Sequence, residues 1–246
     1  MDIQKLSVEI QSGEVTIPAY LAHPTGAQGL PLIVVIQEVF GVNAHIRDVT
    51  DRLASEGYVA IAPHIYHRQA PGFEVGYGSA DLALGREYKN GTQASELLQD
   101  IKGAIIYGHH HFGCPIAKVG CIGFCFGGHV AYLAATLPEI AATASFYGAG
   151  ISTFTPGEGS PTLNQTPQIQ GAIYAFFGLQ DPLISSDEIG QIEAALRQSG
   201  VEHRIYRYPQ ASHGFFCDHR DSYDAAATED AWQQVKNLFR DTLRSR

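Results

Sequence analysis

Five short apolar runs that lack polar alternation constrain the fold of this chain more than any other feature. They lie at residues 32–36, 58–62, 119–123, 142–146 and 173–177. Such runs are typical of strands that are buried on both faces of a sheet. Helical patterns lie between or after them, at residues 44–56, 92–110, 126–137, 186–199 and 222–243. Strands that alternate with helices predict an α/β fold with a mostly parallel central sheet and helices on both faces.

The remaining segments complete this prediction. Residues 3–10 and 14–23 alternate between apolar and polar side chains on either side of Ser12-Gly13, which predicts an antiparallel strand pair at the N-terminus. Residues 204–208 predict one further strand. The segments 69–80 and 148–166 are rich in Gly, Pro, Ser and Thr, and we expect surface loops there. No repeat or linker divides the chain, so we expect a single domain over residues 1–246.

Charge and composition exclude several classes of protein. Sixteen basic and 25 acidic residues give a net charge of −9, and a chain without a lysine or arginine run is poorly suited to bind nucleic acid. No apolar stretch approaches the roughly 20 residues that cross a bilayer, and the first residues lack the pattern of a signal peptide. We therefore expect a cytoplasmic monomer that acts on a small molecule and binds neither nucleic acid nor membrane.

The four cysteines are too few for a disulfide scaffold, and their spacing matches no zinc site. We expect no metal and no cofactor, and a reduced compartment that leaves a thiol free for chemistry. Three of the cysteines are expected to be small buried apolar residues, namely Cys114, Cys121 and Cys217.

The fourth thiol stands in a pattern that predicts a nucleophile. The apolar run at residues 119–123 leads into Gly-Phe-Cys-Phe-Gly, with Cys125 at its centre, and a helical pattern follows. This strand–turn–helix arrangement is a nucleophile elbow with cysteine in place of serine. Side chains two residues either way would clash with the adjacent strand and helix, so Gly123 and Gly127 suit the turn. The start of a helix also favours a thiolate.

A nucleophile of this kind needs a histidine base and an acid that orients it, in the chain order nucleophile, acid, histidine. Asp181 follows the strand predicted at residues 173–177, and His213 follows the strand predicted at residues 204–208. Both positions lie beyond the carboxyl ends of strands, where α/β sheets bind ligands. The competing histidines fit this order less well, and they are His109, His110, His111, His129, His203 and His219.

Three segments together resemble the dienelactone hydrolase family (carboxymethylenebutenolidases) of the α/β-hydrolase superfamily. They are Gly-Phe-Cys-Phe-Gly-Gly at residues 123–128, Gln-Glu-Val-Phe-Gly-Val-Asn at 37–43, and Tyr-His-Arg-Gln-Ala-Pro-Gly at 66–72. The resemblance spans nearly the whole chain and implies an α/β-hydrolase fold. It is more specific than the elbow alone, because Asp181 and His213 follow in the expected order.

The resemblance implies a role for each residue of the site. Cys125 attacks a lactone or ester carbonyl, Asp181 orients His213, and His213 transfers protons. Glu38 is similar to a family glutamate that helps convert the thiol into a thiolate; a carboxylate held in a buried position can accept a thiol proton. The backbone N–H groups of two further residues would form the oxyanion hole, Val39 and Phe126.

Substrate recognition follows the family pattern less closely. Dienelactone hydrolases use two arginines to hold a substrate carboxylate, and Arg86 matches one of them across an alignment gap. The other family position, four residues after the histidine, is Cys217 here, with Arg220 nearby but out of register. A thiol cannot supply the directional binding of a guanidinium. Two tyrosines are further candidates for lining the pocket, Tyr88 and Tyr147.

The leading hypothesis is a hydrolase that opens a dienelactone-type enol lactone, or cleaves a related small ester, through an acyl-thioester on Cys125. The missing arginine motivates an alternative, a general carboxylesterase or thioesterase that acts on neutral esters. A third possibility is a non-catalytic module that only binds a small molecule. The reactivity of the Cys125 thiol and turnover of esters with and without a carboxylate separate the three.

Overall fold

A single eight-stranded sheet forms the centre of the computed structural model, which describes residues 1–244. The sheet order is β1-β2-β4-β3-β5-β6-β7-β8. Its strands are β1 (Ile3–Ser12), β2 (Val15–Pro24), β3 (Leu32–Ile36), β4 (Val59–Pro63), β5 (Val119–Phe124), β6 (Ile140–Phe146), β7 (Ala172–Gly178) and β8 (His203–Tyr208). β1 pairs antiparallel with β2, and β2 pairs antiparallel with β4. The other pairings are parallel, so the predicted α/β-hydrolase architecture with its antiparallel N-terminal pair is confirmed.

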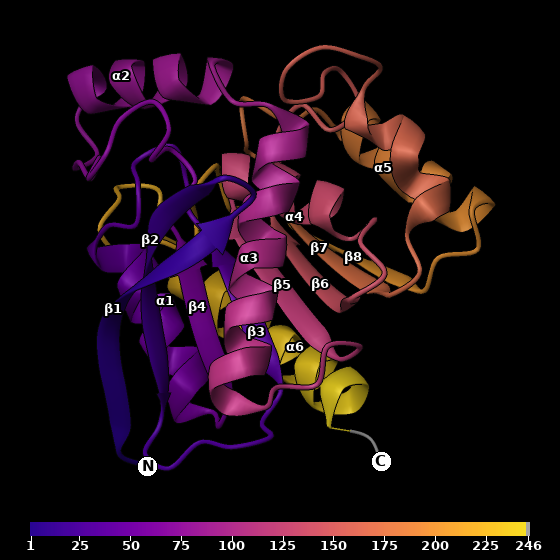
Figure 1. The fold of residues 1–246 in the computed structure, drawn as a ribbon. Coiled ribbons are helices and arrows are strands. Elements are labelled where there is room, and N and C mark those ends of the chain that lie inside the picture. Colours follow the sequence, from indigo (N-terminus) through magenta and orange to yellow (C-terminus); the bar gives the residue numbers. More distant parts are fainter. Residues whose placement is uncertain (245–246) are drawn as a thin grey trace.

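Helices cover both faces of the sheet. α1 (Ala44–Ser55) and α6 (Ala225–Leu243) pack on one face, and α3 (Ala94–Phe112) and α4 (Phe126–Ala134) pack on the other. Figure 1 shows α3 running across the front of the sheet. α5 (Ser186–Gln198) packs beside β8. Within the described residues, no helix is long and apolar enough to cross a membrane.

The central strands explain why the apolar runs show no alternation. In β3, Ile33 and Val35 belong to the core that α1 and α6 cover, whereas Leu32, Val34 and Ile36 belong to the core beneath α3 and α4. All five side chains are fully buried. Because each face of the strand needs apolar contacts, polar residues are excluded from both.

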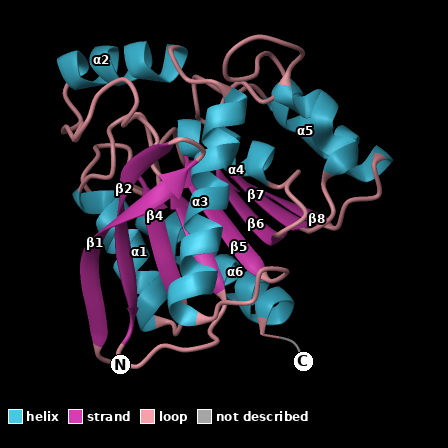
Figure 2. Cartoon of the chain, viewed as in Figure 1, coloured by secondary structure: helices cyan, strands magenta, loops and turns pink. Residues whose placement is uncertain are grey.

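Two helices lie partly within the segments for which the sequence predicts loops. α2 (Ser79–Asn90) begins just inside the first predicted loop, and the 3-10 helix η1 (Thr162–Gln168) lies at the end of the second. Figure 2 shows α2 apart from the sheet and joined to it by loops. Only Gly85 of α2 is buried, so this helix carries no apolar stripe of the kind that makes a helix visible in a sequence.

The parallel strands bring distant segments together at one edge of the sheet. The chain leaves β3 towards Glu38, β5 towards Cys125, β7 towards Asp181 and β8 towards His213. Since parallel strands share the edge at which they end, residues up to 175 positions apart in the sequence become neighbours there.

Candidate active site

Cys125 occupies a strained turn between β5 and α4. Its backbone has φ 56° and ψ −119°, a conformation that side-chain-bearing residues adopt rarely and that is typical of functional sites. The Cys125 N–H donates to the carbonyl of Phe146 at 3.0 Å, which ties the turn to the end of β6. The thiol is partly exposed, whereas the other three cysteines are buried.

Glycines make this turn possible, as the sequence predicts. A Cβ on Gly123 would collide with the carbonyl of Gly127, and a Cβ on Gly127 would collide with the carbonyl of Gln37. A Cβ on Gly128 would collide with the carbonyl of Phe146. The helix therefore starts in direct backbone contact with β3 and β6, and this contact holds the sulfur at the sheet edge.

The structure brings His213 and Asp181 together. The Asp181 carboxylate accepts a 2.7 Å hydrogen bond from His213 Nδ1 through Oδ2, and Oδ1 accepts from the Leu183 N–H at 2.8 Å. The Asp181 side chain is completely buried, and that of His213 is 8% exposed. With both carboxylate oxygens occupied, Asp181 fixes the orientation of the imidazole ring.

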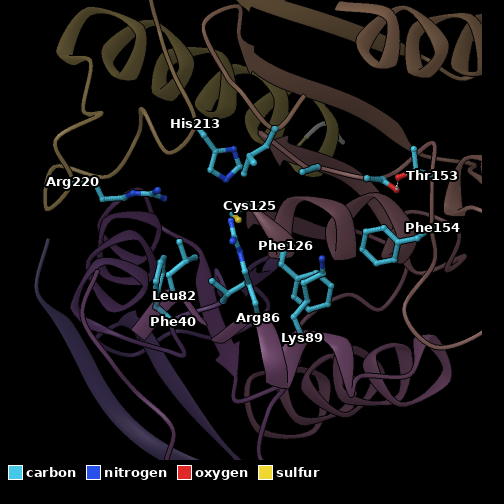
Figure 3. Close-up of a pocket in the computed structure, with 14 residues that line it drawn as sticks. Phe40, Leu82, Arg86, Lys89, Cys125, Phe126, Thr153, Phe154, His213 and Arg220 are labelled. Atoms are coloured by element: carbon cyan, nitrogen blue, oxygen red, sulfur yellow. Dashed lines mark hydrogen bonds between the residues drawn. The ribbon is translucent and has the colours of Figure 1, made fainter. Parts of the chain in front are cut away.

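The electrostatic environment of His213 favours the imidazolium form. Burial lowers the pKa of His213, but the charge of Cys125 and the hydrogen bond to Asp181 outweigh it and raise that pKa to about 10. His213 Nε2 is buried and makes no hydrogen bond of regular geometry within the described residues. Figure 3 shows the ring next to the Cys125 sulfur. This nitrogen is therefore free to exchange a proton with a reacting group.

The two residues predicted to donate to the oxyanion, Val39 and Phe126, both line the cavity that opens at Cys125. Val39 follows β3, and Phe126 is the first residue of α4, where backbone N–H groups have no partner inside the helix. Neither N–H donates to another protein group within residues 1–244. Two unpaired N–H groups beside the sulfur suit the negative oxygen of a tetrahedral intermediate.

Glu38 is completely buried behind this cavity and pairs with Arg220. The Arg220 guanidinium donates to Glu38 Oε1 at 3.0 Å. Glu38 Oε2 is buried and has no hydrogen-bond partner in the described part of the chain. The arginine thus occupies one carboxylate oxygen, and the other remains available to accept a hydrogen bond or a proton.

A cavity of about 370 Å³ opens above Cys125 (Figure 3). Its apolar lining includes Val39, Phe40, Leu82, Phe126, Phe154 and Leu183. Three cations also line it, Arg86, Lys89 and Arg220. The cavity therefore combines an apolar body with positive charge, which suits a small organic anion.

Arg220 reaches the cavity although its place in the sequence does not match the family arginine. The chain turns after His213, with the Arg220 N–H donating to the carbonyl of Cys217 at 3.2 Å. Gly214 has φ 81°, and a side chain there would occupy the space of the Arg220 guanidinium. Two consecutive turns of this loop thus place the Arg220 guanidinium at the cavity that Cys125 also lines. Cys217 itself is buried and donates to the Tyr77 hydroxyl at 3.2 Å. A search that kept the family spacing fixed could not find Arg220.

The structure does not bring the two predicted tyrosines into the cavity lining. The Tyr147 side chain is completely buried, with its ring centroid 5.1 Å from that of His213. Tyr88 packs against Phe73, at 4.8 Å between ring centroids. The next residue, Lys89, lines the cavity instead. Lys89 lies three residues after Arg86, so a helix predicted at this point would have placed both on one side.

The other titratable groups that the sequence singles out have different surroundings. Burial raises the pKa of the Cys114 thiol to about 12 and that of the Cys217 thiol to about 11, and it also raises the pKa of Cys121. These thiols are therefore neutral and unreactive at physiological pH. His129 is buried, with Nε2 2.7 Å from the Thr162 hydroxyl, and burial lowers its pKa to about 4. His109, His110 and His111 are exposed at the end of α3.

One buried group of side chains could offer ligands to a metal ion. The donor atoms of Glu38, His45 and Cys217 lie within 4.8 Å of one another. Arg220 already compensates the charge of Glu38, and Cys217 is a neutral thiol that donates to Tyr77. A metal ion bound here would therefore have to displace the Cys217 proton and compete with the Arg220 guanidinium for Glu38.

Comparisons with known proteins agree with this architecture. The model of the dienelactone hydrolase family matches residues 17–243. A Synechocystis sp. protein that bears the name carboxymethylenebutenolidase is 51% identical over 244 residues, 99% of each chain. An Escherichia coli protein of the same name is 33% identical over 91% of this chain and 82% of its own length. The crystal structure of a Klebsiella pneumoniae protein described as a dienelactone hydrolase has a TM-score of 0.87 at 30% identity, over 97% of this chain and 99% of that chain. This chain therefore belongs to the dienelactone hydrolase family of ester-hydrolysing enzymes.

Proposed function

We propose that the protein hydrolyses a small lactone or ester that carries a carboxylate, of the dienelactone type, through an acyl-thioester on Cys125. The observation that carries this proposal is the alignment of Cys125, His213 and Asp181 at the edge of a cavity that three cations line. Membership of the family supports the reaction class, and the cations support a substrate with negative charge.

The first half of the reaction uses the proton that His213 holds. The Cys125 thiolate adds to the carbonyl carbon, and the N–H groups of Val39 and Phe126 bind the resulting oxyanion. The carbon–oxygen bond then breaks, and the departing oxygen takes the proton from His213 Nε2. Each well-placed oxyanion donor typically lowers the barrier by about 3 kcal/mol.

The second half regenerates the enzyme. Neutral His213 takes a proton from water, the hydroxide attacks the thioester carbonyl, and the carbon–sulfur bond breaks to return the thiolate and the imidazolium. Asp181 keeps the ring oriented throughout. Glu38 offers a second acceptor, Oε2, for the proton of a neutral Cys125 thiol, and in this way returns the thiol to its reactive form.

Arg86 and Arg220 support recognition of a substrate carboxylate. Both line the cavity, and a guanidinium binds a carboxylate with two directed hydrogen bonds. Arg220 supplies what Cys217 cannot at the position where other family members have an arginine. This arrangement favours an acidic substrate over the neutral esters of the alternative hypothesis.

Turnover of matched substrates tests this preference. We expect kcat/KM for cis-dienelactone to exceed that for p-nitrophenyl acetate, because only the first carries a carboxylate for the cavity cations. The measurement is steady-state hydrolysis of both compounds by the same preparation, with Cys125→Ala as the blank. A large preference for the neutral ester would identify a general esterase instead.

The pH dependence of alkylation tests the pairing of Cys125 with His213. The raised pKa of His213 means that its positive charge persists through neutral pH, and this charge favours the adjacent thiolate. We expect iodoacetamide to label Cys125 at a lower pH in the wild type than in His213→Gln, which lacks the charge. Mass spectrometry of the labelled peptide gives the rate at each pH. Identical profiles for the two proteins would contradict the ion pair.

A further inference from the structure

Lys89 is a cation of the cavity that the reaction proposed above does not use. It lies in the last turn of α2, three residues after Arg86, and both side chains line the cavity. In Figure 3, Lys89 and Phe154 lie on the opposite side of Cys125 from Arg220. Positive charge therefore flanks the nucleophile on two sides.

The Lys89 ammonium has no carboxylate partner among residues 1–244. It lies 4.5 Å from the centre of the Phe154 ring and 6.0 Å from that of Phe126, and within residues 1–244 it forms no ion pair. The side chain is half-buried, and burial lowers its pKa although the charge of Cys125 opposes this effect. A half-buried ammonium without a carboxylate partner is energetically unfavourable. The chain has 25 acidic residues, and none of those described pairs with Lys89.

The three cations differ in what they can still bind. Arg220 is neutralised by Glu38, whereas Arg86 and Lys89 have no carboxylate partner in the described part of the chain. A substrate with one carboxylate, held by the arginines, would leave the Lys89 end of the cavity without compensation. The walls at that end are the rings of Phe126 and Phe154, with Thr153 beside them. Among the described residues that line the cavity, Lys89 is the cation that lies over these two rings.

We propose that Lys89 forms a second anion subsite, so that the cavity selects substrates with acidic groups on both sides of the scissile carbonyl. The carbonyl lies at Cys125, one acidic group faces Arg86 and Arg220, and the other faces Lys89. This inference rests on the proposed function for the position of the carbonyl. The volume of about 370 Å³ accommodates a small diacid of this kind.

Binding of unreactive diacids tests the subsite without any turnover. The probes are glutarate, adipate and pimelate, each compared by calorimetry with the monocarboxylate of equal chain length. We expect the wild type to bind at least one diacid about ten-fold more tightly than its monocarboxylate partner, as for a charge-assisted hydrogen bond in a partly buried site. In Lys89→Met this ratio should fall towards one, and Lys89→Arg should retain it.

Lys102→Met is the matched control, because it removes one positive charge from an exposed site on α3 and should keep the wild-type ratio. A wild type that prefers none of the three diacids, or a Lys89→Met variant with an unchanged ratio, overturns the subsite. Since the probes are not esters, either result is independent of hydrolysis at Cys125. Loss of the proposed function would appear instead as ester turnover that survives Cys125→Ala.

Discussion

Replacing Cys125 with alanine is expected to reduce kcat for ester hydrolysis by about 10⁴-fold or more, because the variant has no atom that can form the acyl intermediate. The oxyanion donors and the cavity would remain, so weak binding of substrate should persist. Steady-state kinetics on the best substrate of the panel, with mass spectrometry to detect the acyl-enzyme, measures both effects.

Two controls separate chemistry from folding in this experiment. Cys114→Ala removes a buried thiol outside the cavity lining and should leave kcat close to the wild-type value. Thermal unfolding of Cys125→Ala checks that the turn at φ 56° tolerates the change. A folded Cys125→Ala protein with wild-type kcat would show that the sulfur is not the nucleophile.

Asp181→Asn is expected to lower kcat by about 10³- to 10⁴-fold, the effect seen when a buried acid that orients a histidine becomes an amide. The variant loses the charge that supports the imidazolium and the acceptor that fixes the ring at 2.7 Å. Because Asp181 contributes to the raised pKa of His213, the variant should hold less imidazolium in mildly alkaline solution. The loss of activity should therefore grow from neutral to alkaline pH, which a pH profile of kcat/KM measures.

The matched control for this change is Asp187→Asn, in the exposed first turn of α5. It removes the same charge a short distance along the chain, without contact to His213. An Asp181→Asn enzyme as active as Asp187→Asn would assign Asp181 a structural role only.

The centre of the sheet could be predicted from sequence because its five central strands, β3 to β7, are buried on both sides. In β3, for example, packing against helices on each face requires five consecutive apolar residues. This apolar run can be seen directly in the sequence of the segment. α2 could not be predicted in this way. It contributes one buried glycine, so its sequence carries no periodic apolar signal.

The same distinction applies to the candidate site. Cys125 can be predicted because Gly123 and Gly127 mark the turn in the sequence itself, although the contact that requires Gly127 is with the distant carbonyl of Gln37. Lys89 is not predicted because it lies on a helix that the sequence does not reveal. Arg220 is out of register in the sequence and reaches the cavity only through the path of its loop. Their positions follow from tertiary structure, for which local sequence has no equivalent signal.

The contact between α2 and the sheet edge has a consequence for how this protein can change. A Cβ at Gly85 would collide with the carbonyl of Val39, so the helix rests directly on the backbone of a residue that lines the cavity. Apart from this glycine, no residue of α2 is fully buried, and only Leu82 and Tyr88 pack partly against the core. Evolution or design can therefore exchange the exposed residues of this helix, and with them the charge of the cavity wall, without moving the backbone on which the helix rests.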